Sequence, residues 1–175
     1  MSGHWVLGGA AIAHDVTSDY SRFVDFTQYQ SFMWIKEPER IDPALKREIV
    51  EGINAQLESK GLHLVTDHAD LAISANVATG ERFTLSSFYE CFPADWNWHH
   101  NMGPGSPSNL NDWGRKDTFK PGTLVVDMFS VQDKRIVWWS VANKFVYEVA
   151  PEGPKHIVEL FDEMFSGNQW WTTTP

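Results

Sequence analysis

His99 and His100 are the residues of this chain whose types could most readily hold a metal ion. They share their region of the chain with Asp95, Asp112 and Cys91. Imidazole nitrogens and carboxylate oxygens together suit zinc and other divalent ions. Adjacent histidines in a strand or loop tend to point apart, however, and no H-E-x-x-H or C-x-x-C pattern accompanies them. The sequence therefore favours an exposed polar pair over a metal site, and we expect no metal and no cofactor.

A second set of residues has the types needed for acid–base catalysis. Asp67 and Asp70 flank His68 and could orient its imidazole. The candidate nucleophiles are Ser74 and Ser87. No G-x-S-x-G elbow or other positioned nucleophile accompanies them, so the segment from Asp67 to Asp70 is better interpreted as a turn between strands. We therefore predict no catalytic residues and a protein that is not an enzyme.

Three further reactive side chains have ordinary structural explanations. Asp25 and Asp127 lie in or beside predicted strands, where an aspartate usually bonds the local backbone. Cys91 lies among aromatic residues, where a thiol more often packs as a small hydrophobe than reacts. These three residues therefore indicate neither a catalytic nor a redox role.

The tryptophans, nine in the chain, are the remaining signal for binding. Trp96, Trp98 and Trp113 lie in one segment rich in Gly and Pro, and Trp138 and Trp139 are adjacent in a predicted strand. Neighbouring side chains of a strand face opposite ways. One of Trp138 and Trp139 should therefore enter the core, and the other should face outward or lie under the long segment.

Two interpretations of the clustered indoles stay open. They could fold back as a lid over the outer side of the sheet, because exposed indoles are disfavoured and can supply a core to a long loop. They could instead form an aromatic platform for a glycan, a peptidoglycan fragment or a partner protein. The candidate binding residues are therefore Trp96, Trp98, Trp113 and Trp139.

Two helices must help to position these residues. The first, over 43–60, starts with an N-cap acid and a proline at Asp42-Pro43 and ends at Gly61. Its apolar residues recur every four positions, at Leu45, Ile49, Ile53 and Leu57. The second, over 155–166, carries one apolar stripe and also ends at a glycine.

Runs of β-branched and aromatic residues predict several strands. The expected segments are 23–35 with a turn at 25–29, 62–65, 71–79, 82–92, and a hairpin of 123–131 and 135–149 around the polar turn 132–134. Together with the helices they predict an α+β fold, with an antiparallel or mixed sheet and both helices on one face. Residues 1–175 should form a single domain, with 93–121 as a long loop rich in Trp, Gly and Pro.

Composition limits the partners and the compartment. The 175 residues include 14 Lys+Arg and 23 Asp+Glu, and the net charge of −9 disfavours nucleic acid as a partner. No apolar run is long enough to span a membrane. Residues 5–13 form a short apolar patch that ends in Ala-Ile-Ala, the A-x-A form of a signal-peptidase site. Residues 1–15 are therefore expected to be the remnant of a leader or a ragged N-terminus.

Several blocks of the sequence resemble the bacterial family called domain of unknown function 4136. The first, at 19–34, contains Asp-Phe-x-x-Tyr. The others are the helix 41–61 with its Lys-Gly turn, Ala-Asp-Leu at 69–71, and Lys-Pro-Gly-Thr-Leu-Val-Val-Asp at 120–127 with Ile-Val-Trp at 136–138. The resemblance covers roughly residues 16 to 166, and the blocks are fairly specific together.

The resemblance implies a location and little mechanism. Members of that family are typically secreted or lipid-anchored envelope proteins with no established enzymatic activity. This chain departs from the pattern in two ways, since it lacks the cysteine that a lipoprotein would acylate, and Trp139 stands where a basic residue is usual. A lipid anchor would therefore belong to a native precursor whose leader precedes this numbering.

From these observations we expect a non-enzymatic protein of the bacterial cell envelope, periplasmic or associated with the outer membrane. It would act by binding or assembly, with an envelope protein or a glycan as its partner. The alternative is a module that binds a small ligand or glycan through the Trp-rich loop. The least favoured function is a metal-dependent enzyme at His99 and His100.

Overall fold

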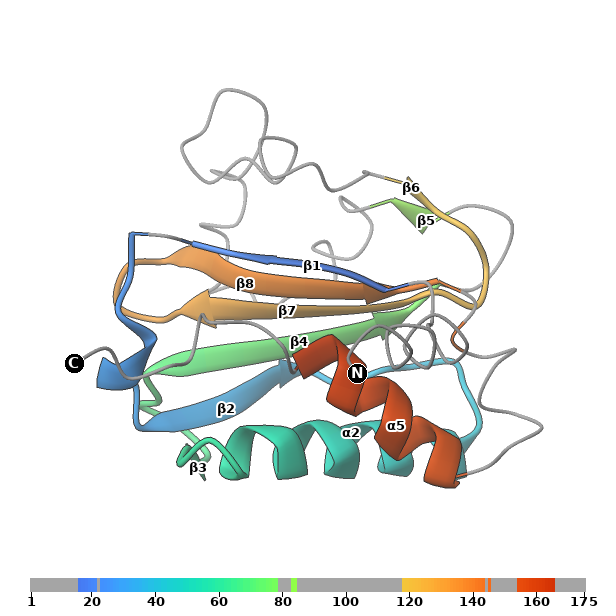
Figure 1. Ribbon diagram of the computed structural model, residues 1–175, viewed down its shortest axis with the longest axis horizontal. Helices are drawn as coiled ribbons and strands as arrows, with labels where there is room; N and C mark the ends of the chain where they lie inside the picture. Colours follow the sequence, from blue (N-terminus) through green and yellow to red (C-terminus); the bar gives the residue numbers. More distant parts are fainter. Residues whose placement is uncertain are drawn as a thin grey trace, which may run out of the picture.

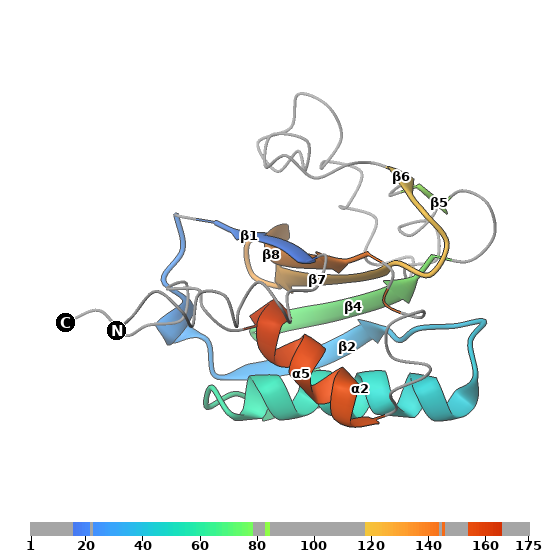
Figure 2. The same ribbon diagram turned by 45° about the vertical axis from the view of Figure 1, so that its right-hand side comes forward.

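The computed structural model describes residues 16–21, 23–78, 83–84, 118–143, 145 and 154–165. A mixed six-stranded sheet lies at the centre, and two helices cover one of its faces (Figure 1). A small two-stranded sheet lies on the opposite side from the helices (Figure 2). The expected α+β fold with both helices on one face is therefore confirmed.

The main sheet joins strands from both halves of the sequence. Its strands are β1 (Val16–Tyr20), β2 (Ser31–Lys36), β3 (His63–Leu64), β4 (Leu71–Val77), β7 (Leu124–Ser130) and β8 (Arg135–Ala142). Their order across the sheet is β1-β8-β7-β4-β2-β3. β2 runs parallel to β3 and β4, and the other neighbouring pairs are antiparallel. The small sheet pairs β5 (Phe83–Thr84) with β6 (Thr118–Phe119).

The chain enters the sheet earlier than the sequence pattern predicts. β1 pairs with β8 before the expected first strand segment begins. Within that segment, Phe26–Gln28 forms a short 3-10 helix (η1) at the predicted turn 25–29, and β2 follows it. The carboxylate of Asp25 accepts hydrogen bonds from the backbone N–H and the hydroxyl of Thr27 and so caps η1.

Helix α2 (Pro43–Glu58) ends by the motif that its sequence predicts. The N–H of Gly61 donates to the carbonyl of Glu58 at 3.0 Å, and the N–H of Leu62 donates to the carbonyl of Leu57 at 3.2 Å. This is the Schellman arrangement, which needs a left-handed residue, and Gly61 has a φ of 93°. Leu57 and Leu62 are both buried, so the motif also fixes the chain against the core.

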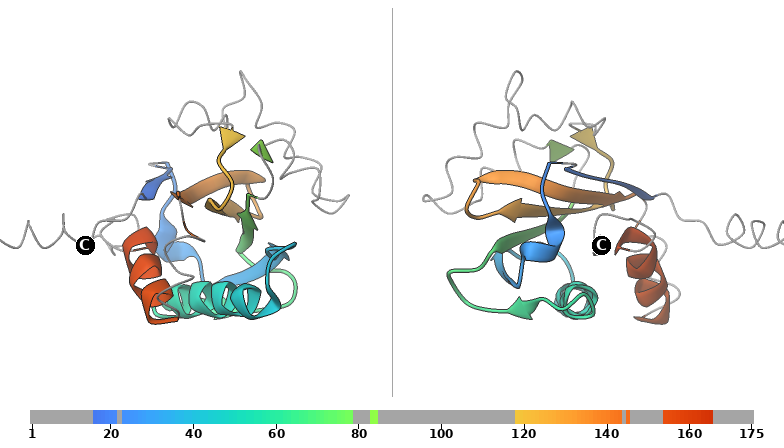
Figure 3. Two further views of the ribbon diagram at one scale, coloured as in Figure 1. Left: turned by 90° about the vertical axis from the view of Figure 1, so that its right-hand side faces the viewer. Right: turned by 60° about the vertical axis from the view of Figure 1, so that its left-hand side comes forward.

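Helix α5 (Pro154–Phe165) packs closely on α2 (Figure 3). The contact explains a glycine in the middle of α2, where an alanine would favour the helix by about 1 kcal/mol. A Cβ atom at Gly52 would lie 2.5 Å from ring carbons of Phe161. Beside this contact, Gln56 Nε2 donates to Asp162 Oδ1 at 2.7 Å. Gly52 therefore sets the distance between the two helices.

The two faces of the main sheet bury two separate apolar clusters. The helix-side core lies between the sheet and the helices, and it includes Trp138, whose ring stacks on Phe165 with centroids 4.8 Å apart. The outer core lies on the opposite face and consists of Ala72, Ala78, Phe119, Val125, Phe129, Ile136, Trp139 and Val141. Trp138 and Trp139 therefore face opposite ways, which confirms the predicted alternation, and both are fully buried.

Candidate functional site

A row of buried polar side chains crosses the outer face of the main sheet. Residues paired in register on neighbouring strands point to the same face. Lys36 on β2 pairs with Ser74 on β4, and Ser74 pairs with Asp127 on β7. Asp127 pairs with Trp139 of the outer core, which assigns the row to that face. Lys36, Ser74 and Asp127 are all buried, and burying a polar group costs free energy unless it is hydrogen-bonded.

A β-bulge in β2 turns Lys36 toward this row. Phe32 and Trp34 pack on the helix-side core, and a regular strand would send Lys36 to the same side. The pairing of β2 with β4 shifts register between Trp34 and Lys36, so Ile35 is the extra residue. Bulges re-aim side chains and are frequent beside functional sites. The bulge therefore places a lysine among the polar residues of the outer face.

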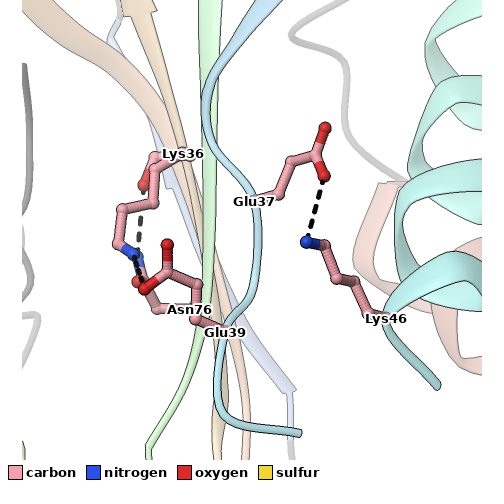
Figure 4. A network of polar contacts seen from close by, with 6 residues as sticks. Lys36, Glu37, Glu39, Lys46 and Asn76 are labelled. Carbon is pink, nitrogen blue, oxygen red and sulfur yellow. Dashed lines mark hydrogen bonds and ion pairs between the residues drawn. The ribbon is translucent and has the colours of Figure 1, made fainter. Parts of the chain in front are cut away.

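Figure 4 shows the polar contacts of Lys36 and Asn76. Lys36 Nζ lies 3.3 Å from Oε1 of Glu39, and the side chains of Lys36 and Glu39 are 7% and 64% exposed. Asn76 follows Ser74 on the same face of β4, and its Nδ2 donates to Ser74 Oγ at 3.2 Å. Among the described residues, a buried ammonium is thus neutralised by one carboxylate that comes from the surface.

Ser74 is the nucleophile of this row, and its contacts do not activate it. A catalytic serine needs a base within hydrogen-bond reach. Ser74 Oγ accepts a hydrogen bond from Asn76, whereas the ammonium of Lys36 lies against Glu39. In the described residues, Ser74 and Lys36 therefore do not form a nucleophile and base pair.

The acid–base candidates Asp67, His68 and Asp70 form a turn. His68 is exposed with a φ of 56°, and its Nδ1 lies 3.3 Å from Asp67 Oδ1. Asp70 Oδ2 accepts a hydrogen bond from the backbone N–H of Gln30 at 2.7 Å, which joins the start of β4 to the start of β2. Ser74 lies fully buried on the outer face, so the structure does not bring His68 and Ser74 together.

Asp25 and Tyr29 serve the local structure at one end of the sheet. The hydroxyl of Thr27, and then its backbone N–H, donate to Asp25 and hold the pKa of its carboxyl below the usual value. Burial raises the pKa of the Tyr29 phenol, against the opposing effect of the Ser130 hydroxyl, and nearby aspartates raise it further. Both residues therefore act in the turn that leads into β2.

Most of the site residues expected from the sequence lie outside the described residues. These are Trp96, Trp98, Trp113, His99 and His100, so the lid, the aromatic platform and the metal site all stay predictions. Within the part of the chain that the structure describes, no group of three or more His, Cys, Asp or Glu residues could hold a metal ion. No described helix is both long and apolar enough to cross a bilayer.

Trp139 is the one candidate binding residue that the structure describes, and it is 1% exposed. An indole buried in the outer core offers no surface for contact in this conformation, so a binding role for Trp139 stays a prediction that would need the outer face to be uncovered. Lys36 and Asn76 were missed by the sequence analysis. The available signal was weak, since it consisted of a lysine at the end of an apolar strand and an asparagine within another.

Comparisons with known proteins identify a family and a fold. The family model described as "Domain of unknown function (DUF4136)" matches residues 16–167. A crystal structure of a DUF4136 family protein from Bacteroides thetaiotaomicron VPI-5482 is 17% identical, has a TM-score of 0.59, and the match covers 91% of this chain and 97% of that chain. This likeness shows the fold alone. No curated protein matches this chain.

Two further solved structures match with TM-scores below 0.5. A PelC dodecamer from Paraburkholderia phytofirmans is 8% identical with a TM-score of 0.43, and the match covers 87% of this chain and 98% of that chain. A PDZ domain protein from Parabacteroides distasonis ATCC 8503 is 13% identical with a TM-score of 0.46, and the match covers 92% of this chain and 40% of that chain. Likenesses this distant carry no functional argument.

Proposed function

The chain belongs to the domain of unknown function 4136 family, as its sequence blocks predict, and from this premise we propose that it is a non-enzymatic protein of the bacterial cell envelope that acts by binding or assembly. The typical location of the family supports the envelope. The partner class that we propose is another envelope protein.

The proposed contact surface includes β1, the terminal strand of the main sheet. β1 lies at the end of the strand order, and all five of its residues are at least partly exposed. The N–H of Ser21 donates to the carbonyl of Val137 at 2.8 Å. Bonded positions alternate along an antiparallel pair, so the N–H groups of Ser18 and Tyr20 face away from β8. An edge of this kind can accept a strand from a partner protein.

An exposed aromatic residue follows this strand. Phe23 is 98% exposed, and it comes two residues after the last hydrogen bond to β8. Isolated apolar residues on a surface are ordinary, but one at the end of an edge strand can anchor an added strand. Asp19 restrains unspecific pairing, because its Oδ1 accepts a hydrogen bond from the outward-facing N–H of Tyr20 at 2.8 Å. The proposed contact surface is therefore β1 with Phe23, in place of the buried Trp139.

Substitutions at the edge test this surface. Ser18→Pro removes an N–H that faces away from β8 and should block strand addition with little effect on the sheet itself. Ser18→Ala is the matched control, because it also loses the hydroxyl bond to Ser140 Oγ at 2.7 Å. A photo-crosslinker at Thr17 should form one discrete envelope adduct in cells with the wild type and with Ser18→Ala. Ser18→Pro and Phe23→Ser should abolish it, and an adduct that survives both changes would overturn the proposed surface.

Cell fractionation tests the location separately. The native gene product should partition with the periplasm or the outer membrane of its host. Recovery of the protein with the cytosol would overturn the envelope assignment, whatever the crosslinking result.

A further inference from the structure

Lys36, Ser74 and Asn76 bring several hydrogen-bond donors together on the outer face of the main sheet. A lysine ammonium has three N–H donors, an asparagine amide has two, and a serine hydroxyl has one. Within the described part of the chain, the Lys36 ammonium contacts Glu39 alone, and Asn76 uses one donor on Ser74. Lys36, Ser74 and Asn76 are each at least nine-tenths buried. Buried donors are stabilised by acceptors, so this corner suits a group rich in acceptors.

We propose that Lys36, Ser74 and Asn76 form a binding site for a carboxylate, which the side chain of Glu39 occupies in this structure. The ion pair itself shows that a carboxylate oxygen fits at 3.3 Å from the buried ammonium. A ligand carboxylate has a second oxygen, which can accept from the amide or hydroxyl beside Lys36. The inference concerns the outer face of the sheet and does not depend on the envelope role or on the edge of β1.

Glu39 is suited to exchange with a ligand. Its side chain is 64% exposed, so the Glu39 side chain lies between the ammonium of Lys36 and the solvent. A carboxylate that replaced Glu39 would keep the buried charge neutralised, which avoids the large penalty of an unpaired buried ion. The next residue, Arg40, has a φ of 62°, a conformation that is uncommon outside glycine.

The chain offers a matched control for Glu39. Glu37 lies in the same connection and pairs with Lys46 at 3.6 Å, but both side chains of that pair are exposed by more than 40%. Glu37→Gln and Glu39→Gln thus remove the same charge from the same segment (Figure 4). Only the second change should free the buried lysine.

In the test, the full chain is titrated with sodium acetate, and the 13Cε NMR signals of labelled lysines report binding. In Glu39→Gln, the Lys36 signal should shift and saturate. The wild type and Glu37→Gln should need about fivefold more acetate for half-saturation, because Glu39 still competes for Lys36. A fivefold factor corresponds to the free energy of a weak ion pair. The exposed Lys134 should shift without saturation in all three proteins. Adding Asn76→Ala to Glu39→Gln should weaken acetate binding.

Three results would overturn the proposal. One is a Lys36 signal in Glu39→Gln that follows acetate without saturation, as Lys134 does. Another is the same half-saturation in the wild type and in Glu39→Gln, because Glu39 would then not occupy the site. The third is acetate binding that stays unchanged in both Asn76→Ala and Ser74→Ala, which would leave Lys36 as an ordinary cation.

Discussion

The helix-side face and the outer face of the main sheet are both buried, but the buried polar groups of the two faces have different kinds of partner. On the helix side, Ser140 is a buried polar residue, and its hydroxyl shares a hydrogen bond of 2.7 Å with Ser18 Oγ. Around it lie large apolar side chains, with Trp138 stacked on Phe165. This face pairs its polar group internally, as expected of a core whose role is stability.

On the outer face, buried polar residues interrupt the apolar cluster. Lys36 is one of them, and it pairs with the exposed carboxylate of Glu39. A buried cation held by a surface residue contributes little to stability. The helix-side face is thus an apolar core with an internally paired hydroxyl, whereas the outer face holds the proposed carboxylate site.

The largest loss of stability is expected from a substitution in the helix-side core. Trp138→Ala should lower the free energy of unfolding by about 3–5 kcal/mol, because it removes a fully buried indole from the larger core. Urea denaturation followed by circular dichroism measures the change. A loss below about 1 kcal/mol would show that this face is not the main source of stability.

The next effect concerns the contact of the two helices. Gly52→Ala should destabilise the protein by about 1–3 kcal/mol, because the new Cβ overlaps the ring of Phe161 and outweighs the gain in helix propensity. Glu51→Ala, on the exposed side of the same helix turn, is the control and should be close to neutral. Equal stabilities of the two variants would mean that α5 can move away at no cost.

A smaller effect is expected on the outer face. Lys36→Met replaces the ammonium by an apolar side chain of similar length, and stability should change by less than about 1 kcal/mol in either direction. The same urea denaturation measures it. A loss above about 3 kcal/mol would show that the lysine is a structural element, and the contrast between the two faces would then fail.

The smallest effect is expected at the exposed carboxylate of Asp25, which caps η1. The pKa of Asp25 is below 3.8 in the folded protein, so its contribution is present above pH 3.8 and is lost as the pH falls through the folded pKa. Asp25→Asn should therefore lower the urea midpoint at pH 7, with a difference from wild type that shrinks below pH 3.8. Asp42→Asn is the control, since Asp42 makes no side-chain capping bond at α2. A difference that is independent of pH would contradict the capping role.

Much of the fold could be predicted because its signals are local. Asp42-Pro43 and Gly61 mark the two ends of α2, because each acts on the backbone at a single position. The predicted helix 43–60 is two residues longer at its C-terminus than the observed helix. The polar turn at 132–134 likewise identifies the hairpin of β7 and β8. β1 was missed because Thr-Ser-Asp at its centre has no strand pattern. Its extended form depends on pairing with a strand more than a hundred residues away.

The candidate site could be predicted only in fragments. Ser74 and Asp127 were noticed as isolated residues, whereas Lys36 was not, because an unbroken strand would direct it toward the helices. The register shift at Ile35 depends on how β2 and β4 pair, and no residue in β2 signals it. Nothing in the sequence could therefore bring these residues into one row.

The sequence alone predicts the two helices and the late hairpin, because each depends on residue types at short spacing, and its blocks resemble the family that the family model shows. The tertiary structure decided the order of the strands, the burial of both Trp138 and Trp139, and the meeting of Lys36 with Ser74. These features depend on the pairing of distant strands and on a bulge. Polar side chains that are distant in the sequence form a site only when strand register places them on the same face.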